Sequence, residues 1–310
     1  MSEREIIARL RTLFPRTGDD AAVIGSQVIT SDMLVEDVDF RRAAPIELIA
    51  RKSLAVNLSD LAAMGARPAH AVVAVGLAEW VPWSAFFDAL AAAAHEWKIE
   101  IVGGDLSRSD KLVISIGAVG VTDRPLMRSG AQQGDRIYVS RPIGASAAGL
   151  VLLERQSWSL APPPSLSYAQ RDLAASMIRR HLDPEPEIAL GMALSAIPEV
   201  TACIDISDGL STDLEHLCEA SGCGADIERE RLPIFPDLLS AGGSLGLRPQ
   251  ELVLHGGEDY ALLFTSSLRE AELSSRLHRP VYAIGRVSRE AGMRLNGVAL
   301  EAKGFDHFNR

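Results

Sequence analysis

The chain contains 310 residues, of which 47% are apolar and 23% are charged. An ordinary domain has about 150 residues, so this length predicts two globular domains, and the composition excludes a disordered or collagen-like chain. The formal net charge is −10, from 31 Lys and Arg against 41 Asp and Glu. This charge argues against a general nucleic-acid or anionic-membrane binder, because phosphate groups are repelled.

The cysteines and the apolar segments indicate the cellular compartment. Cys203, Cys218 and Cys223 form no C-x-x-C pair, so neither a disulfide framework nor a zinc ribbon is predicted. The N-terminal segment mixes acids and arginines with its apolar residues, unlike a secretion signal. No window offers the roughly 20 apolar residues that span a bilayer. We therefore expect a cytoplasmic protein with no membrane partner.

Apolar periodicity predicts alternating elements in the N-terminal half, namely a helix over 3–14, strands over 21–24 and 27–30, a helix over 45–64, a strand over 69–77, a helix over 83–97 and strands over 100–102 and 112–121. The second strand is expected to end in Thr30-Ser31-Asp32, and Gly103-Gly104-Asp105 is expected to form a turn. Periodicity is lost over 123–135, so we expect domains 1–130 and 131–310.

The C-terminal half is expected to contain a strand over 136–140, a helix over 145–155, a strand over 200–206, a helix over 208–220 and strands near Ala225, Leu262 and Val281. Strands and helices alternate without strict βαβ regularity, and no repeat of 20 to 50 residues is present. The sequence therefore predicts two α+β domains with largely antiparallel or mixed sheets.

Aspartates recur at the ends of expected strands and at glycine turns, with one more on a helix: Asp20, Asp32, Asp105, Asp205, Asp208 and the helical Asp60. Glycine lets a ligand approach the backbone, and aspartate supplies the hard oxygen donors that suit Mg²⁺. Each aspartate taken alone is more simply explained as a turn residue or a helix cap. Six carboxylates converging on one site would repel one another unless several cations were present.

Other catalytic signatures are absent from the sequence. The lysines at 52, 98, 111 and 303 do not lie in a G-x-x-x-x-G-K-[ST] context, and protein-kinase motifs are missing. The seven histidines lie in no recognised nucleophile motif. A Walker-type ATP site and covalent catalysis by a side-chain nucleophile are therefore not predicted.

The motifs of this chain nevertheless resemble those of the thiamine-monophosphate kinase family. They occur in the family's order and span nearly the whole chain: Gly18-Asp19-Asp20, Thr30-Ser31-Asp32, the AVNLSDLAAMGA segment at 55–66, Gly103-Gly104-Asp105, Arg128-Ser129-Gly130, Asp205-Ile206-Ser207-Asp208-Gly209-Leu210, Gly256-Gly257-Glu258-Asp259-Tyr260 and Lys303-Gly304-Phe305-Asp306-His307-Phe308. The 55–66 segment and the Gly-Gly-Glu-Asp-Tyr segment are the most specific.

This resemblance implies an α+β, two-domain fold of the aminoimidazole-ribonucleotide-synthetase type. Its N-terminal mixed α/β domain would form a barrel with a second copy in a homodimer, and its C-terminal α+β domain would complete the cleft for ATP and substrate. The implied reaction moves the ATP γ-phosphoryl group directly onto the phosphate of thiamine monophosphate, giving thiamine diphosphate and ADP. Several Mg²⁺ ions would screen the two polyanions, and no protein nucleophile would be required.

The resemblance also assigns residues. The implied metal ligands are Asp20, Thr30, Ser31, Asp32, Asp60, Asp105, Asp205 and Asp208. The implied ATP contacts are Trp97, Gly104, Asp105, Arg128 and Ser207, and the implied substrate positions are Asp39, Glu258 and Phe305, with Asp259 structural. From the residues alone, Arg128 is equally explained as a linker arginine, Trp97 as a buried helix-end residue and Phe305 as an apolar plug.

The chain departs from the family pattern at Asp39, where a histidine near the substrate is typical. An ionised aspartate cannot donate to a phosphate oxygen, so that contact is not transferred. Met33 and Leu106 stand where threonine is common. Two alternatives therefore remain, namely an ATP-dependent enzyme of the same fold with another small substrate, and a nucleotide- or thiamine-phosphate-binding protein without turnover.

Overall fold

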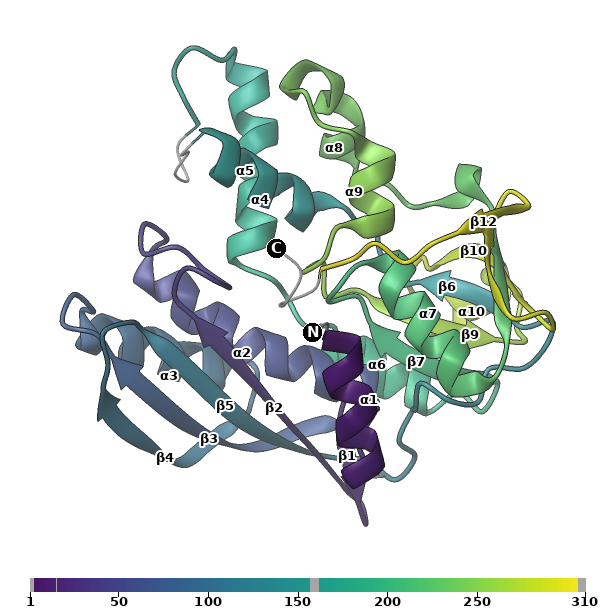
Figure 1. The fold of residues 1–310 in the computed structure, drawn as a ribbon, viewed down its shortest axis with the longest axis horizontal. Helices are drawn as coiled ribbons and strands as arrows, with labels where there is room; N and C mark the ends of the chain where they lie inside the picture. Colours follow the sequence, from purple (N-terminus) through teal and green to yellow (C-terminus); the bar gives the residue numbers. More distant parts are fainter. Residues whose placement is uncertain (1–2, 15, 157–161, 306–310) are drawn as a thin grey trace.

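The computed structural model describes residues 3–14, 16–156 and 162–305. The described chain forms two α+β units, each built on its own mixed sheet (Figure 1). The N-terminal sheet has the strand order β1-β2-β5-β3-β4, and the C-terminal sheet has the order β12-β11-β8-β10-β6-β9-β7. The predicted α+β class with mixed sheets is confirmed.

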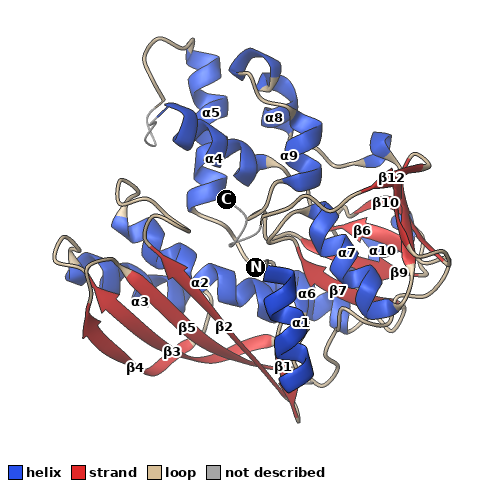
Figure 2. Cartoon of the chain, in the orientation of Figure 1, coloured by secondary structure: helices blue, strands red, loops and turns tan. Residues whose placement is uncertain are grey.

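The N-terminal elements are α1 (Glu3–Leu13), β1 (Ala22–Ile24), β2 (Gln27–Val35), α2 (Ile46–Ala63), β3 (Arg67–Leu77), α3 (Trp83–Glu96), β4 (Glu100–Arg108) and β5 (Val113–Val121). The C-terminal elements are β6 (Arg136–Val139), α4 (Ala145–Gln156), α5 (Tyr168–Leu182), α6 (Ile188–Ser195), β7 (Val200–Asp205), α7 (Leu210–Ser221), β8 (Gly224–Ile227), α8 (Pro236–Ala241), α9 (Pro249–His255), β9 (Leu262–Ser266), α10 (Glu270–Leu277), β10 (Tyr282–Ser288), β11 (Gly292–Leu295) and β12 (Val298–Leu300). Figure 2 shows how helices and strands are distributed.

Two local predictions in the N-terminal sheet are wrong. Strand β2 continues past Asp32 to Val35, because its whole length pairs with β5. The Gly103-Gly104-Asp105 segment lies inside β4 and forms no turn. A Cβ on Gly104 would lie 1.8 Å from the Val73 carbonyl oxygen of β3, so glycine is needed there for the close approach of two strands.

Helix α2 connects the two units. Most of its residues are buried, because α2 packs against β2 and β5 on one side and against α6 and β7 on the other. A Cβ on Gly191 of α6 would lie 2.0 Å from the Ala62 carbonyl oxygen of α2. The glycine therefore permits the close contact of α2 and α6.

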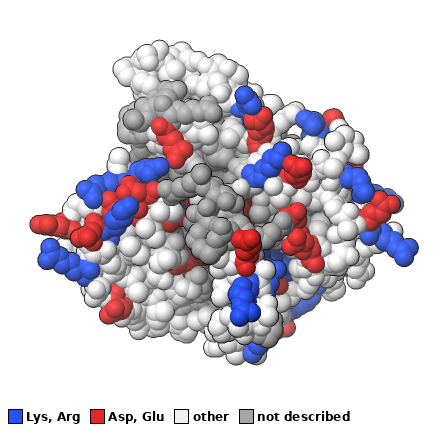
Figure 3. Space-filling model, in the orientation of Figure 1, with Lys and Arg blue, Asp and Glu red and all other residues white. Residues whose placement is uncertain are grey.

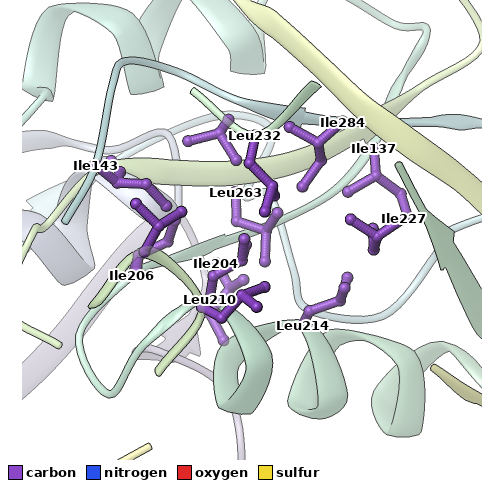
Figure 4. Close-up of a cluster of buried hydrophobic side chains, with 14 of the residues drawn as sticks. Ile137, Ile143, Ile204, Ile206, Leu210, Leu214, Ile227, Leu232, Leu263 and Ile284 are labelled. Carbon is purple, nitrogen blue, oxygen red and sulfur yellow. The ribbon is translucent and has the colours of Figure 1, made fainter. Parts of the chain in front are cut away.

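The two sheets differ in how their faces are covered. In the C-terminal unit, buried residues of β6, β7, β9 and β10 pack with α7 in one apolar core, which Figure 4 shows in part. In the N-terminal unit, α2 and α3 pack on one face, and the outward residues Met33 and Val72 on the other face are 60% and 50% exposed. One face of the N-terminal sheet is thus open in the single chain.

Charges of both signs are interspersed on the face of the molecule drawn in Figure 3. Within the described residues, no helix combines the length and apolar character needed to cross a membrane. The expected helices over 3–14, 45–64, 83–97, 145–155 and 208–220 are all present to within a few residues. Helices α5, α6, α8, α9 and α10 were not predicted.

Candidate active site

Three predicted metal ligands converge where the two units meet. Asp20 precedes β1, Asp60 lies on α2, and Asp205 is the last residue of β7. One carboxylate oxygen from each lies within 4.8 Å of the other two. Sequence-distant aspartates are therefore gathered at one point by the packing of α2 between the two sheets.

Neighbouring side chains orient these carboxylates. Thr30 Oγ1 donates to Asp60 Oδ2 at 2.5 Å, and Ser59 Oγ donates to Asp205 Oδ2 at 2.5 Å. Arg128 donates to Asp20 Oδ1 from Nε at 3.0 Å and from Nη2 at 2.5 Å. The other oxygen of Asp20, Oδ2, is buried without a hydrogen-bond partner among the described residues.

The electrostatics of the cluster favour cations. Burial raises the pKa of Asp20 to about 7, with a further increase from Asp205 and an opposing effect from Arg128. Burial and the nearby carboxylates also raise the pKa of Asp32 to about 6 and the pKa of Asp60 well above its usual range. Ionisation of these buried carboxyl groups is unfavourable, because little positive charge lies near them. Their hard oxygens, including the unpartnered Asp20 Oδ2, suit Mg²⁺.

A cavity of about 720 Å³ opens beside the cluster, between the two units. Its lining includes the predicted site residues Asp32, Asp39, Asp60, Asp205, Ser207, Asp208, Glu258 and Phe305. Apolar residues from α4, such as Leu150 and Val151, form another part of the wall. Acidic groups and apolar surface thus share one cavity large enough for a small organic molecule.

Asp208 lies before α7 at one side of this cavity. One oxygen of its carboxylate, one of the Asp213 carboxylate and a ring nitrogen of His216 all lie within 4.8 Å of one another. Asp213 Oδ2 also accepts hydrogen bonds from the backbone N–H groups of Asp208 and Gly209, at 3.2 and 3.0 Å. Asp213 therefore fixes the turn that carries Asp208 and Ser207 into the cavity.

The three predicted substrate positions all line the cavity. Asp39 Oδ2 accepts a hydrogen bond from the Val35 N–H at 2.7 Å, so this carboxylate closes the turn after β2. Phe305 is 48% exposed, and its backbone N–H donates to the Asp208 carbonyl at 3.1 Å. Asp259, expected to be structural, accepts from the backbone N–H groups of Gly144 at 2.6 Å and Ser146 at 3.2 Å.

Four predicted residues lie elsewhere in the single chain. Ser31 is exposed and alternates along β2 with Thr30 and Asp32, so it lies on the opposite face of the sheet. Gly104 and Asp105 are exposed on β4, at the edge of the sheet. Trp97 packs under the Arg51 guanidinium, 4.3 Å from the ring centroid. The single chain does not bring these residues to the aspartate cluster.

Lys52 and His181 are among the residues near the cavity that were missed from the sequence. Lys52 is buried on α2 and His181 on α5, and both contact Glu258. Lys52 gave a weak signal, because a charged residue stood within an apolar helical segment. His181 gave none, because its helix was not predicted.

Comparisons with known proteins identify the family of both units. The model "AIR synthase related protein, N-terminal domain" matches residues 18–122, and "AIR synthase related protein, C-terminal domain" matches residues 132–297. Thiamine-monophosphate kinase of Salmonella typhimurium is 38% identical over 94% of this chain and 91% of its own length. The Aquifex aeolicus protein of the same name is 34% identical over 94% and 92%.

The solved structure "AaThiL complexed with AMPPCP and TMP" superposes with a TM-score of 0.88 at 33% identity. The match covers 99% of this chain and 97% of that one. Two domain models in the expected order, and similarity over nearly the full length of the relatives, place both units in one family. The chain belongs to the thiamine-monophosphate kinase family of AIR synthase related proteins.

Proposed function

We propose that this chain transfers the ATP γ-phosphoryl group directly onto the phosphate of thiamine monophosphate, giving thiamine diphosphate and ADP. The observation that carries the proposal is the buried cluster of Asp20, Asp60 and Asp205 beside a cavity of about 720 Å³. Relatives that share nearly the whole chain are thiamine-monophosphate kinases, and a solved relative is complexed with AMPPCP and TMP.

The aspartate cluster would hold several Mg²⁺ ions, through Asp20, Asp60 and Asp205 and through Asp32 and Asp208 at the cavity wall. Bound Mg²⁺ would neutralise the phosphate oxygens of both substrates. Thr30 and Ser59 keep the carboxylates oriented. Arg128 and Ser207 would bind ATP phosphates. Because the acceptor is itself a phosphate oxygen, the reaction needs positioning and charge compensation and no covalent intermediate on the protein.

The opposite part of the cavity would hold the thiamine portion of the substrate. Glu258 offers an anionic acceptor there, and the half-exposed Phe305 offers an aromatic face. The apolar wall from α4 would exclude water from the rings. Asp39 is held by the backbone of β2, and we propose that it contacts substrate only through a metal ion or a donor group.

A second copy of the chain would complete the ATP site. Strand β4 lies three strands away from β2, which is roughly 14 Å at the usual spacing between strands. Its edge is open, and Val102 and Leu106 are 57% and 61% exposed. We propose a homodimer in which the open N-terminal sheets pair and Gly104 and Asp105 of one copy meet the aspartate cluster of the other. A cytoplasmic location fits this use of ATP.

The activity is tested by incubating the purified protein with ATP, Mg²⁺ and thiamine monophosphate. We expect thiamine diphosphate and ADP in equal amounts, and no product when the divalent cation is chelated. Binding of both substrates without product would favour a non-catalytic protein. Neither binding nor turnover of thiamine monophosphate would favour another small substrate.

The shared site is tested by mixing two inactive variants. Asp60→Asn and Asp105→Asn should each lose activity, because each removes charge compensation at a site. When the variants are mixed and allowed to exchange subunits, a mixed dimer contains one site with both aspartates intact. About a quarter of wild-type activity should return on statistical grounds. No recovery despite demonstrated exchange would place both residues in the site of the same chain.

A further inference from the structure

A second buried ionic cluster lies in the wall of the cavity. Lys52 of α2 pairs with Glu258 Oε1 at 2.7 Å, and His181 Nδ1 of α5 contacts Glu258 Oε2 at 3.0 Å. The side chains of Lys52, His181 and Glu258 are 3%, 5% and 26% exposed. The three residues come from both units of the fold, and together we call them the Glu258 cluster.

Only part of the Glu258 cluster reaches the cavity. Glu258 and His181 line it, whereas Lys52 does not. The carboxylate therefore has two faces. Lys52 and His181 bind its inner side, and the remaining acceptor positions of its oxygens are available to a molecule in the cavity.

The partners of His181 determine which of its ring nitrogens carries the hydrogen. A carboxylate can only accept, so Nδ1 must carry the hydrogen that is donated to Glu258. Ser146 Oγ lies 3.1 Å from the same nitrogen. Burial, with Lys52 adding to it, lowers the pKa of His181, which keeps the ring neutral near pH 7. The ring thus acts as a fixed hydrogen-bond donor to Glu258.

Lys52 has a different role, because it balances charge. Burial alone would raise the pKa of Glu258, but the positive charge of Lys52 and the contact with His181 lower it well below its usual range. One buried cation and one carboxylate leave the cluster with no net charge. Glu258 thus remains ionised where an unpaired carboxylate would take up a proton.

The backbone also holds Glu258 in place. Its φ is 63°, in the left-handed region that a residue with a side chain rarely adopts. Its N–H donates to the Ser207 carbonyl at 2.7 Å. Strained backbone costs stability and a buried ion pair contributes little to it, so stability alone does not explain why they coincide in a cavity wall.

We propose that Lys52 and His181 are positioning residues that hold the Glu258 carboxylate, ionised and in one orientation, to bind the cationic nitrogen heterocycle of the substrate. The inference rests on the proposed function, in which the substrate is thiamine monophosphate with its positively charged thiazolium ring. An oriented anion at the wall favours a charged heterocycle over a neutral one of the same shape.

Steady-state kinetics of full-length variants test this proposal. His181→Asn keeps a donor close to the position of Nδ1, whereas His181→Phe removes it. We expect His181→Phe and Lys52→Met to raise KM for thiamine monophosphate by about 10-fold or more, with KM for ATP changed less than about 2-fold. His181→Asn should restore KM to within about 3-fold of wild type.

Arg124→Met is the control for loss of a partly buried cation. Arg124 donates to the carbonyl groups of Ser195, Ile197 and Val200, none of which belongs to the Glu258 cluster. We expect this variant to be less stable than wild type but to keep both KM values. If Arg124→Met raises KM for thiamine monophosphate as much as Lys52→Met does, the effect of Lys52 is merely structural and the proposal is overturned.

A double-mutant cycle distinguishes positioning from direct contact. If Lys52 acts through Glu258, Lys52→Met should add less than about 2-fold to KM in a Glu258→Gln background. Additive effects would overturn the proposal, as would unchanged KM values in Lys52→Met and His181→Phe. Absence of turnover in the wild-type protein is a separate result, and it would reject the proposed function itself.

Discussion

Two buried ionic clusters each reach the same cavity in part, and they differ in charge balance. The aspartate cluster brings Asp20, Asp60 and Asp205 together, and among the described residues Arg128 is the cation that pairs with it. In the Glu258 cluster, Lys52 neutralises one carboxylate. Burial raises the carboxyl pKa values in the first cluster, whereas in the second the neighbouring charges overcome burial and lower the pKa of Glu258.

This difference indicates what each cluster needs. The Glu258 cluster is neutralised by residues of the folded chain itself, so it can present the Glu258 carboxylate as a fixed anion. The aspartate cluster has more negative than positive charge, so it needs bound cations to neutralise it. Cations that arrive with the substrates would supply that charge. Substitutions that remove one acid should therefore have opposite effects on stability at the two places.

The largest expected effect is on turnover. Asp60→Asn should lower kcat by at least about 100-fold, a barrier increase of roughly 2.7 kcal/mol, because a proposed metal ligand is lost. Asp226→Asn is the matched control, since Asp226 lies on β8 and pairs with Arg294 at 3.9 Å. The comparison is made by assaying both variants with saturating Mg²⁺. Near-normal kcat in Asp60→Asn would show that the aspartate cluster takes no part in the reaction.

The next effect is on the stability of the Glu258 cluster. Glu258→Gln leaves the ammonium of Lys52 buried without an opposite charge, so it should lower the free energy of unfolding by about 3 kcal/mol. Denaturant unfolding monitored by fluorescence measures this loss. Adding Lys52→Met to Glu258→Gln should recover part of it. Wild-type stability in the single variant would show that the pair is not coupled.

A smaller effect of opposite sign is expected beside the aspartate cluster, at Asp32 of the cavity wall. Asp32→Asn removes one of the mutually repelling charges, so the metal-free variant should unfold at a temperature equal to or above that of wild type at pH 8. Mg²⁺ should stabilise wild type more than the variant. Thermal unfolding with and without a chelator measures both. Strong destabilisation of metal-free Asp32→Asn would contradict the charge imbalance.

The smallest expected effect is on pH dependence. The pKa of Asp20 is raised to about 7 and that of Asp205 to about 6, whereas unfolded aspartates titrate near 4. The folded protein therefore binds protons that the unfolded chain has released, so stability without metal falls as pH rises from about 5 to 7.

The histidines His181 and His255 have lowered pKa values and act in the opposite direction. A comparison with a variant isolates the aspartates from this effect. In melting curves recorded in chelator across this pH range, Asp205→Asn should lose less stability with rising pH than wild type. Identical slopes would show that Asp205 does not titrate as inferred.

Local signals predicted much of the fold. Apolar periodicity predicted α2, β3 and β5 to within a few residues, because apolar side chains recur where an element is buried. The later helices α5 and α6 were not predicted. The turn predicted at Gly104 was wrong, since a residue that allows a turn also allows two strands to approach closely.

The candidate site was predicted in part. Asp60 and Asp205 were identified because acids next to small residues and strand ends are typical of cation sites. Asp105 belongs to a similar motif, yet sheet order places it at an exposed edge. Strand order depends on which strands pair, and spacing along the chain does not encode that pairing. Its role therefore stays a prediction for the proposed dimer.

By itself, the sequence determined the types of most N-terminal elements and the acidic character of the site, because hydrophobic periodicity and residue chemistry are local properties. Only the tertiary structure decided which charges meet. Lys52, His181 and Glu258 lie far apart along the chain and come together because α2 and α5 pack beside the same loop. Their ionisation depends on distance and burial, which exist only once the chain has folded.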